Sequence, residues 1–197
     1  MKKYELTEET VTVYGKTLYR IRAVRDFGSV KTGEFGGYIE KEENLSHFGN
    51  AWVSGNAWVF DNARVYDDTW VYGNARVYDN AWVFGNAWVF GNAKVYDDAW
   101  VCGDAKVYGD AWVSGNAEVF NTRHFFVQGP IGSRDGYVTF YRTKDDTVEV
   151  RCGCFSGSLQ KFVDRVEETH GGSRYEKEYK LAAELAKVCI RLEGESR

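Results

Sequence analysis

The sequence predicts an all-β solenoid, and three observations carry that prediction. Residues 50–120 repeat a six-residue unit twelve times, in the pattern Asn/Asp-Ala-x-Val-x-Gly/Asp. Valine recurs at every sixth position from Val53 to Val119, and alanine precedes it by two positions everywhere except at Thr69. Every third unit is also more alike than adjacent units are. Such a period means that each unit contacts mainly its neighbours, which is the defining property of a solenoid.

Alternation within one unit assigns a direction to each side chain. Ala and Val should point inward on a short strand of about four residues, and the residue after each should point outward. The Gly/Asp-Asn/Asp pair should turn the corner, because these residues tolerate positive φ. The first corner position is Gly at 55, 73, 91 and 109, and Asp at 61, 79 and 97. Three sides per turn therefore predict an 18-residue triangular parallel coil, repeated about four to five times.

The unit resembles the hexapeptide repeat of left-handed parallel β-helix proteins. That family has an aliphatic residue at its first position and a small residue at its fifth, as Val53 and Ala57 do here. The resemblance covers roughly residues 35–122 and implies a left-handed coil. Within this superfamily the chain is similar to bacterial and prophage proteins described as transferases or polymer-forming proteins, and the superfamily is usually trimeric.

Three parts follow along the chain. Residues 1–34 should form an N-terminal hairpin or cap, because residues 10–14 and 17–21 alternate around Gly15-Lys16. Residues 35–122 should form the β-helix, with a degenerate first coil in which Ile39 and Leu45 fall in the alanine phase. Residues 123–197 should form a C-terminal α+β module of a β-hairpin and two helices.

The C-terminal module shows its elements by pattern. Residues 137–142 and 147–152 alternate as a hairpin, with Val138, Phe140, Val148 and Val150 on its buried face. Ser158 is the expected N-cap of a first helix that ends at His170. The capping box of Ser173 and Glu176 opens a second helix, whose packed face should carry Tyr175, Tyr179, Ala182, Leu185, Ala186 and Cys189.

Composition excludes several classes of function. The net charge of −4 is too small to indicate a nucleic-acid or membrane partner. Residues 1–9 lack the apolar stretch of a signal peptide, and no segment has transmembrane length. The four cysteines lack the spacing of a disulfide framework. We therefore expect a cytoplasmic protein, in the host cytoplasm if a phage encodes it, and one that uses no cofactor.

The outward positions of the array are unusually aromatic, because 16 of the 24 are Trp, Tyr or Phe. Stacking of every third unit sorts these positions into three faces. The first face carries Trp52, Trp70, Trp88 and Lys106 beside Ser54, Tyr72, Phe90 and Tyr108. The second face carries Trp58, Arg76, Lys94 and Trp112 beside Phe60, Tyr78, Tyr96 and Ser114. The third face carries Arg64, Trp82, Trp100 and Glu118 beside Tyr66, Phe84, Cys102 and Phe120.

Aromatic ladders suit flat parallel sheets, but six aromatics on one face exceed the apolar patch usual for a monomer. We therefore predict a homo-oligomer, a trimer by the resemblance, that assembles through Trp52, Trp70, Trp88, Tyr72, Phe90 and Tyr108 of the first face. The N-terminal hairpin or a stacked sugar are the other occupants that the sequence allows.

A small-ligand site is predicted in the C-terminal module. Residues 129–134 form a glycine-bearing segment before a strand, and such loops can offer backbone N–H groups to an anion. The exposed face of the hairpin should carry Tyr137, Thr139, Tyr141 and Arg151. The candidate ligand-binding residues are Ser133, Arg134, Thr139, Tyr141 and Arg151, and they suit a phosphate attached to a base or sugar. A surface loop beside a solvated sheet face is the structural alternative.

Three functions remain open from sequence. The first is a non-catalytic oligomeric scaffold whose C-terminal modules capture a nucleotide-like anion or a host protein, for example as a phage counter-defence sponge. The second is a purely structural or assembly protein. The third, implied only by the resemblance, is a hexapeptide-repeat acyltransferase, for which the chain offers the histidines His47, His124 and His170 but no loop inserted into a coil. We assign no catalytic residues. We also assign no metal site, because Cys152 and Cys154 have only His124, His170 and Cys189 as plausible further ligands, and two packed cysteines at the end of a strand are the favoured interpretation.

Overall fold

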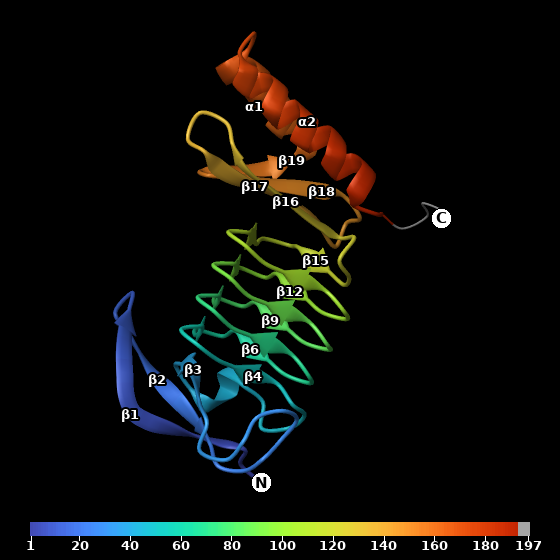
Figure 1. The fold of residues 1–197 in the computed structure, drawn as a ribbon. Helices are drawn as coiled ribbons and strands as arrows, with labels where there is room; N and C mark the ends of the chain where they lie inside the picture. The colour runs from blue at the N-terminus through green and yellow to red at the C-terminus, as the bar shows by residue number, and fades with distance from the viewer. Residues whose placement is uncertain (193–197) are drawn as a thin grey trace.

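A computed structural model describes residues 1–192 and shows a β-solenoid. An N-terminal hairpin lies beside the first coils, and a sheet with two helices lies across the last one (Figure 1). The 18-residue period is confirmed, since each strand pairs in parallel with its equivalent in the next coil, as Trp70 does with Trp88. No helix within residues 1–192 has the length and apolar character needed to cross a membrane.

The three faces predicted from the sequence are three parallel sheets. The first face consists of β4 (Trp52–Val53), β7 (Trp70–Val71), β10 (Trp88–Val89) and β13 (Lys106–Val107). The third consists of β6 (Arg64–Val65), β9 (Trp82–Val83), β12 (Trp100–Val101) and β15 (Glu118–Val119). The strands are two residues long, shorter than the four expected, because the corners take up the rest of each unit.

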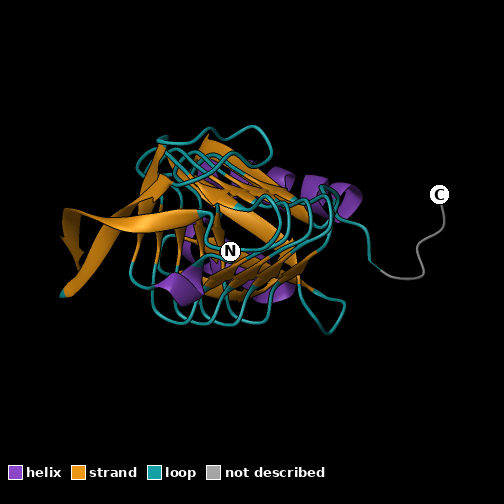
Figure 2. Ribbon diagram, turned by 90° about the horizontal axis from the view of Figure 1, so that it is seen from below, coloured by secondary structure: helices purple, strands orange, loops and turns teal. Residues whose placement is uncertain are grey.

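The second face is longer, because the N-terminal hairpin extends it. Its solenoid strands are β3 (Phe35–Ile39), β5 (Trp58–Val59), β8 (Arg76–Val77), β11 (Lys94–Val95) and β14 (Trp112–Val113), so the solenoid has about five coils. β1 (Tyr4–Val13) and β2 (Lys16–Ala23) form the predicted hairpin and join this sheet antiparallel, in the order β1-β2-β3. Seen from below, the hairpin projects to one side of the stacked coils (Figure 2).

The interior confirms the predicted directions. Every repeat valine is fully buried, and so are the alanines, each with at most 1% of its surface exposed. Each buried valine contributes on the order of 1.5–2 kcal/mol. The corners have the positive φ that their composition predicted, at Asp61, Asp67, Asp79, Asp97 and the corner glycines.

Backbone hydrogen bonds join each coil to both of its neighbours. The outward strand residues donate to carbonyls of the following coil, as Trp70 N does to Ala87 O at 3.0 Å and Tyr72 N does to Val89 O at 3.0 Å, and the parallel register has the inward valines bond to the preceding coil. The first and the last coil therefore each keep backbone N–H and C=O groups without a neighbouring coil. Buried backbone groups need partners, so both ends require caps.

Donors cap the N-terminal end. The fully buried Lys3 amine donates to Ala51 O at 2.7 Å, Gly49 O at 3.4 Å and Phe48 O at 3.5 Å. The Tyr4 hydroxyl donates to Leu45 O at 2.7 Å. Burial, with a smaller contribution from the charge of Arg25, lowers the pKa of Lys3 to about 8.

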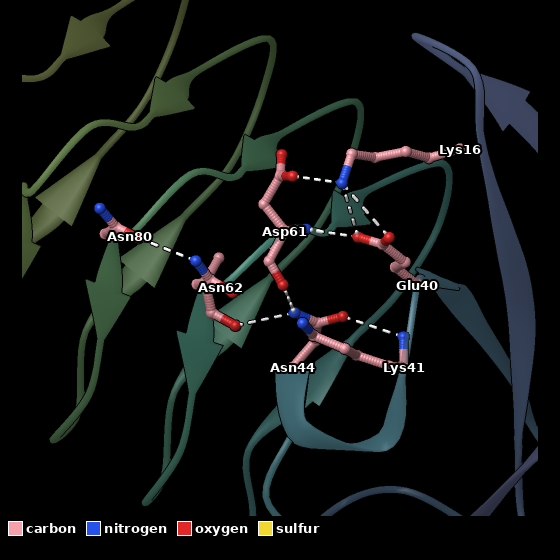
Figure 3. A network of polar contacts seen from close by, with 8 residues as sticks. Lys16, Glu40, Lys41, Asn44, Asp61, Asn62 and Asn80 are labelled. Carbon is pink, nitrogen blue, oxygen red and sulfur yellow. Dashed lines mark hydrogen bonds and ion pairs between the residues drawn. The ribbon is translucent and has the colours of Figure 1, made fainter.

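A polar network fastens the hairpin to the first full coil (Figure 3). The Lys16 amine, at the hairpin turn, forms ion pairs with Glu40, at 3.3 Å, and with Asp61. Glu40 also accepts from the Asp61 backbone N–H at 2.6 Å. The amide of Asn44, in the short 3₁₀ helix η1 (Glu42–Asn44), donates to Ala63 O at 2.9 Å.

The degenerate coil differs from its expected register. Ile39 pairs with Val59 and Leu45 with Val65, so each partner lies two positions beyond the one that the 18-residue period requires. Both residues therefore occupy valine positions, not alanine positions. The regular spacing returns by Trp52, which pairs with Trp70, so the corner between Leu45 and Trp52 holds two additional residues.

The corner side chains also form directed ladders. The Asn74 amide donates to Asn92 Oδ1 at 3.1 Å, and Asn92 donates to Asp110 Oδ1 at 2.9 Å. Asn86 ends in the same way on Asp104. An Asp at the last step needs only to accept, which explains why these ladders change from amide to carboxylate.

The C-terminal module has a larger sheet than predicted. β16 (Phe125–Ile131), β17 (Gly136–Arg142), β18 (Val148–Cys152) and β19 (Phe155–Ser158) form one antiparallel sheet in that order. The hairpin of β17 and β18 is the predicted one, whereas β16 and β19 were missed. β16 replaces part of the expected glycine-bearing loop.

Two helices cover one face of this sheet, close to their predicted bounds. They are α1 (Leu159–His170), whose N-cap Ser158 accepts from Lys161 N, and α2 (Arg174–Cys189), whose N-cap Ser173 accepts from Glu176 N. Val138, Phe140 and Val150 pack beneath them as predicted. Leu185 is a correction: it is 47% exposed, and Ala183 is buried in the helix interface instead.

Thr69→Ala should stabilise the protein. Thr69 occupies an alanine position, is fully buried, and its hydroxyl has no hydrogen-bond partner. Removing an unsatisfied buried hydroxyl should raise the free energy of unfolding by about 1 kcal/mol, measured by urea unfolding. The reverse change one coil later, Ala87→Thr, should lower it. Shifts of the same sign in both variants would contradict this explanation.

Lys3→Met should remove a pH-dependent gain in stability. The pKa of Lys3 is about 8 in the folded protein, below its value of about 10.4 in an unfolded chain. Between these pH values the unfolded chain binds more protons at Lys3, so this amine should make the free energy of unfolding rise with pH. Burial raises the pKa of the Cys102 thiol to about 11, so cysteine ionisation in the unfolded chain should oppose this rise above about pH 8.5. Burial raises the pKa of Tyr179 to about 12, so tyrosine ionisation should oppose this rise above about pH 10.

The measurement is urea unfolding at several pH values between about 7.5 and 9.5, below the range in which tyrosines ionise. Lys2→Met is the matched control, because Lys2 is the exposed neighbour that pairs with Glu42. This control should keep the slope of the wild type, and Lys3→Met should make the slope lower than that of the wild type. Three parallel curves would show that the Lys3 amine does not titrate differently on folding.

Candidate functional site

A cavity of about 1110 Å³ lies between the second face of the solenoid and the C-terminal module. The solenoid contributes Arg76, Lys94 and Trp112 from β8, β11 and β14. The module contributes the turn after β16, the end of β18 and one side of α1. The cavity therefore exists because the module closes the end of the coil and overhangs one of its sides.

The solenoid wall places two cations side by side. Arg76 and Lys94 are partners in neighbouring strands, and their side chains lie over Trp58 and Trp112, at 4.4 and 4.1 Å from the ring centroids. Within residues 1–192 neither has a carboxylate within ion-pair distance. Burial, and then the charge of Arg76, lowers the pKa of Lys94. Two adjacent cations without a counterion make this wall attractive to an anion.

The module wall adds three arginines. Arg134 lies on the exposed turn, Arg151 on β18 and Arg165 on α1. Arg165 pairs with Glu168, and Arg151 pairs with Asp97 at 3.8 Å, whereas Arg134 has no carboxylate partner among the described residues. Asp110 is the one acid among the described residues that line the cavity. The lining thus contains five cations against one carboxylate.

The predicted ligand residues separate into two groups. Ser133, Arg134, Thr139 and Arg151 line this cavity, and Tyr141 does not. Ser133 and Arg134 are exposed. Arg151 lies at the seam, where its Nε donates to Ser114 Oγ at 2.8 Å.

The sheet face expected to be open is instead packed on the last coil. Tyr141 is fully buried in the solenoid core, with its hydroxyl 3.5 Å from Ser114 Oγ. Thr139 is nearly buried, and its hydroxyl accepts from Trp112 N at 3.0 Å. These two residues cap unpaired N–H and hydroxyl groups of the last coil, which is a structural role. The sequence prediction treated the module separately from the coil, so it left this face without a neighbour.

The glycine-bearing turn also differs from its predicted use. Gly132 N donates to Glu178 Oε2 at 2.7 Å, so this N–H is already occupied by a carboxylate of α2. A Cβ at Gly132 would collide with the Tyr179 hydroxyl, and the residue has φ +77°. Glycine is therefore required here for close approach to α2, and Arg134 is held beside the cavity as a result.

The predicted oligomer interface is partly covered. Trp52 is fully buried beneath the 24–34 segment, with its ring 5.4 Å from that of Phe27. It therefore contributes no surface to an interface. Trp70, Tyr72 and Trp88, with Ser29 and Ser54, line a second cavity of about 470 Å³ at the edge of this cover. Trp88 and Tyr108 are 40% and 46% exposed, and Phe90 stacks between Tyr72 and Tyr108.

Two histidines and two cysteines that the sequence offered for catalysis or metal binding can be placed in the structure. His47 stacks on Tyr4 at 4.2 Å and accepts from Lys3 N, which makes it part of the N-terminal cap. His170 lines the large cavity and lies against Tyr179. Cys152 and Cys154 also line it, and burial raises the pKa of the Cys152 thiol. No cluster of three or more potential metal ligands occurs within residues 1–192.

Sequence reasoning missed the solenoid half of this cavity. Arg76 and Lys94 occupy outward positions that are aromatic in most units, and these positions are equivalent in successive coils. Two successive cations on one face were a usable signal. Their meaning depends on the module above them, which the repeat pattern does not position.

Comparison with known proteins agrees with the architecture. A family model described as YdcK Beta solenoid repeat matches residues 71–85 and 75–90, within the central coils. No curated protein matches the chain. The match and the structure together support a β-solenoid.

Thr139→Val should destabilise the protein, whereas Ser133→Ala should not. The valine leaves the part-buried Trp112 N–H without its acceptor, which costs about 1 kcal/mol or more. Ser133 is exposed on the turn, so its hydroxyl is replaced by water at little cost. Thermal unfolding of both variants distinguishes the capping role from a binding role. Equal melting temperatures would mean that the module does not cap the coil through Thr139.

Proposed function

We propose that this protein is a binding protein for a small anion that carries a flat ring, such as a nucleotide, and that the ligand lies in the large cavity. The observation that carries the proposal is the convergence of five cations from two separate parts of the chain, with Asp110 as the one lining carboxylate among the described residues. The solenoid acts as a rigid wall and the module as the opposite wall.

Charge supports the anionic part of this ligand. The side chains of Arg76, Lys94 and Arg134 have no described carboxylate partner, so an entering phosphate would not have to displace an existing ion pair. Arginine binds phosphate oxygens with a bidentate fork, and a hydrogen bond to a charged group contributes about 1.5–3 kcal/mol. Relief of the repulsion between Arg76 and Lys94 would add to this binding.

Aromatic side chains support the planar part. Tyr137 is 40% exposed at the cavity wall, and Phe155 is half-buried beside it. The Tyr137 ring lies against Gly129, where a Cβ would approach it to 2.5 Å, so the strand beneath holds the ring in place. A base or another flat ring can stack on such a surface.

The resemblance to hexapeptide-repeat proteins adds a finer proposal about the scaffold. We expect a left-handed coil that has kept no acyltransferase site and instead displays the module at its end. Sequestration of a small signalling nucleotide by a phage-encoded copy is one use of such a protein. Capture of a host protein and a purely structural role are the alternatives that the following test separates.

The test is calorimetry with inorganic phosphate, a nucleoside monophosphate and a sugar phosphate. The nucleoside monophosphate should bind most tightly to the wild type. Arg134→Ala and Lys94→Ala should each weaken binding roughly ten- to a hundredfold, which corresponds to the loss of one charge-assisted hydrogen bond. Binding should also weaken with added salt.

Lys106→Ala is the matched control. Lys106 lies over Trp88 at 4.9 Å, as Lys94 lies over Trp112, but it is on the first face and outside the cavity. This variant should bind like the wild type. If nothing in the panel binds, or if the three variants lose affinity equally, the anion-binding proposal is wrong and a protein partner or a structural role replaces it.

A further inference from the structure

The N-terminal hairpin leaves the third face open, and the C-terminal module reaches only its last coil, where Arg142 lies over the Phe120 ring at 5.3 Å and pairs with Glu118. Figure 1 shows β6, β9 and β12 turned to the viewer, with β15 next to the module. Its aromatic side chains remain accessible: Trp100 is 40% exposed, and Trp82 stacks on it at 5.5 Å. Tyr66 and Phe84 form a second stack beside them at 5.0 Å.

The charges at the two ends of this face are opposite. Arg64 begins the column, is exposed, and stands over Trp82 at 5.6 Å. Glu118 ends the column, has a side chain that is 25% exposed, and has a distant ion pair to Arg142 at 3.7 Å. From the first coil to the last, the column reads positive, Trp, Trp, negative.

This order is self-complementary when the column is reversed. We propose that two copies of the chain associate through their third faces with the solenoid axes antiparallel. The two-fold axis lies in the interface, parallel to the strands and between β9 and β12. Arg64 then faces Glu118 of the second copy, and Trp82 faces Trp100 of the second copy, each twice, as an isologous interface requires.

The second column of the face fits the same arrangement. It consists of Tyr66, Phe84, Cys102 and Phe120, so reversal sets Tyr66 against Phe120 and Phe84 against Cys102. Cys102 is small and buried, and thus leaves room where the ring of Phe84 from the second copy arrives. At that pair a bulky residue faces a small one, which favours close packing across an interface.

The other two faces lack this symmetry. Reversal of the second face would set Arg76 against Lys94, two cations, and the hairpin and the module already cover its ends. Reversal of the first face would set the exposed Lys106 against the buried Trp52. The third face is therefore a better candidate than the first, and the dimer is independent of the proposed ligand, which binds on the second face.

The size of the face sets the strength of the dimer. Four strands at ~4.8 Å spacing span only about 15 Å along the axis. A face of this length buries less area than the ~800 Å² per partner of a standard interface. The association should therefore be reversible, with a dissociation constant in about the micromolar range. The dimer should also weaken at high salt, because its end contacts are ion pairs near solvent.

The test is sedimentation velocity on the full chain over a concentration series. The wild type should shift from 22.5 kDa toward twice that mass as the concentration rises. Arg64→Glu should raise the dissociation constant at least tenfold, because two carboxylates then meet. The charge swap Arg64→Glu with Glu118→Arg should restore dimerisation. Arg174→Glu, the same change at an exposed site on α2, should have no effect.

Several results would overturn the proposal. A wild type that stays monomeric at all concentrations, an Arg64→Glu variant that dimerises normally, or a charge swap without recovery would each do so. A trimer abolished by Trp88→Glu would assign assembly to the first face. If Glu118→Arg disturbs its contact with Arg142 and lowers the melting temperature, Arg64→Gln and Glu118→Gln form the cycle instead. Their effects on the dissociation constant should then be less than additive, and additive effects would refute the contact.

Discussion

Each coil pairs its backbone groups with the coil before it and the coil after it, and the rest of the structure depends on this. The outward residues of a strand bond to the following coil, and its inward valines bond to the preceding one. The two end coils therefore each lack a partner on one side. A buried amine and a phenol supply donors to the first coil, and the hydroxyl of Thr139 supplies an acceptor to the last. Both flanking segments stabilise the solenoid, because each supplies partners to polar groups that would otherwise be buried without them.

The cavity results from the way the C-terminal module caps the coil. A sheet broad enough to close the end of the coil extends beyond its edge, and the overhang forms a second wall opposite Arg76 and Lys94. The hairpin covers the same face only near the first coils, where Phe60 packs with Val13 and Leu18. The last coils thus keep an accessible side. The same contact closes the end of the coil and forms a wall of the cavity, because Arg151 donates to Ser114 and also lines the cavity.

The sequence predicted the structural features that depend on the repeat or on local chemistry, and it missed most of those that depend on contacts between different parts of the chain. The directions of Val and Ala, the corners at Asp61 and Asp79, and the cap at Ser158 depend on local chemistry, so pattern predicted them. The register of Ile39 and Leu45 depends on two additional corner residues that no period reveals. The burial of Trp52 and Tyr141 depends on segments that fold back over the coil from outside the repeat. Of the cations that line the cavity, the sequence predicted Arg134 and Arg151 as ligand-binding residues but not Arg76 and Lys94, because contacts between the repeat and a non-repetitive module leave no periodic signal.

The ladders of the central coils have a consequence for how such a chain can change length. Each ladder interaction joins a residue to its equivalent in the next coil, so duplication or loss of the coding sequence for one whole coil would reproduce these contacts and disturb neither cap. Such an event moves the two ends apart or together by ~4.8 Å. The hairpin cluster reaches Tyr78, and the solenoid lining of the cavity begins at Asn74. Duplication of the coil before residue 74 would therefore lengthen the rod and keep the cavity-lining residues together, whereas loss of a later coil would remove part of that lining.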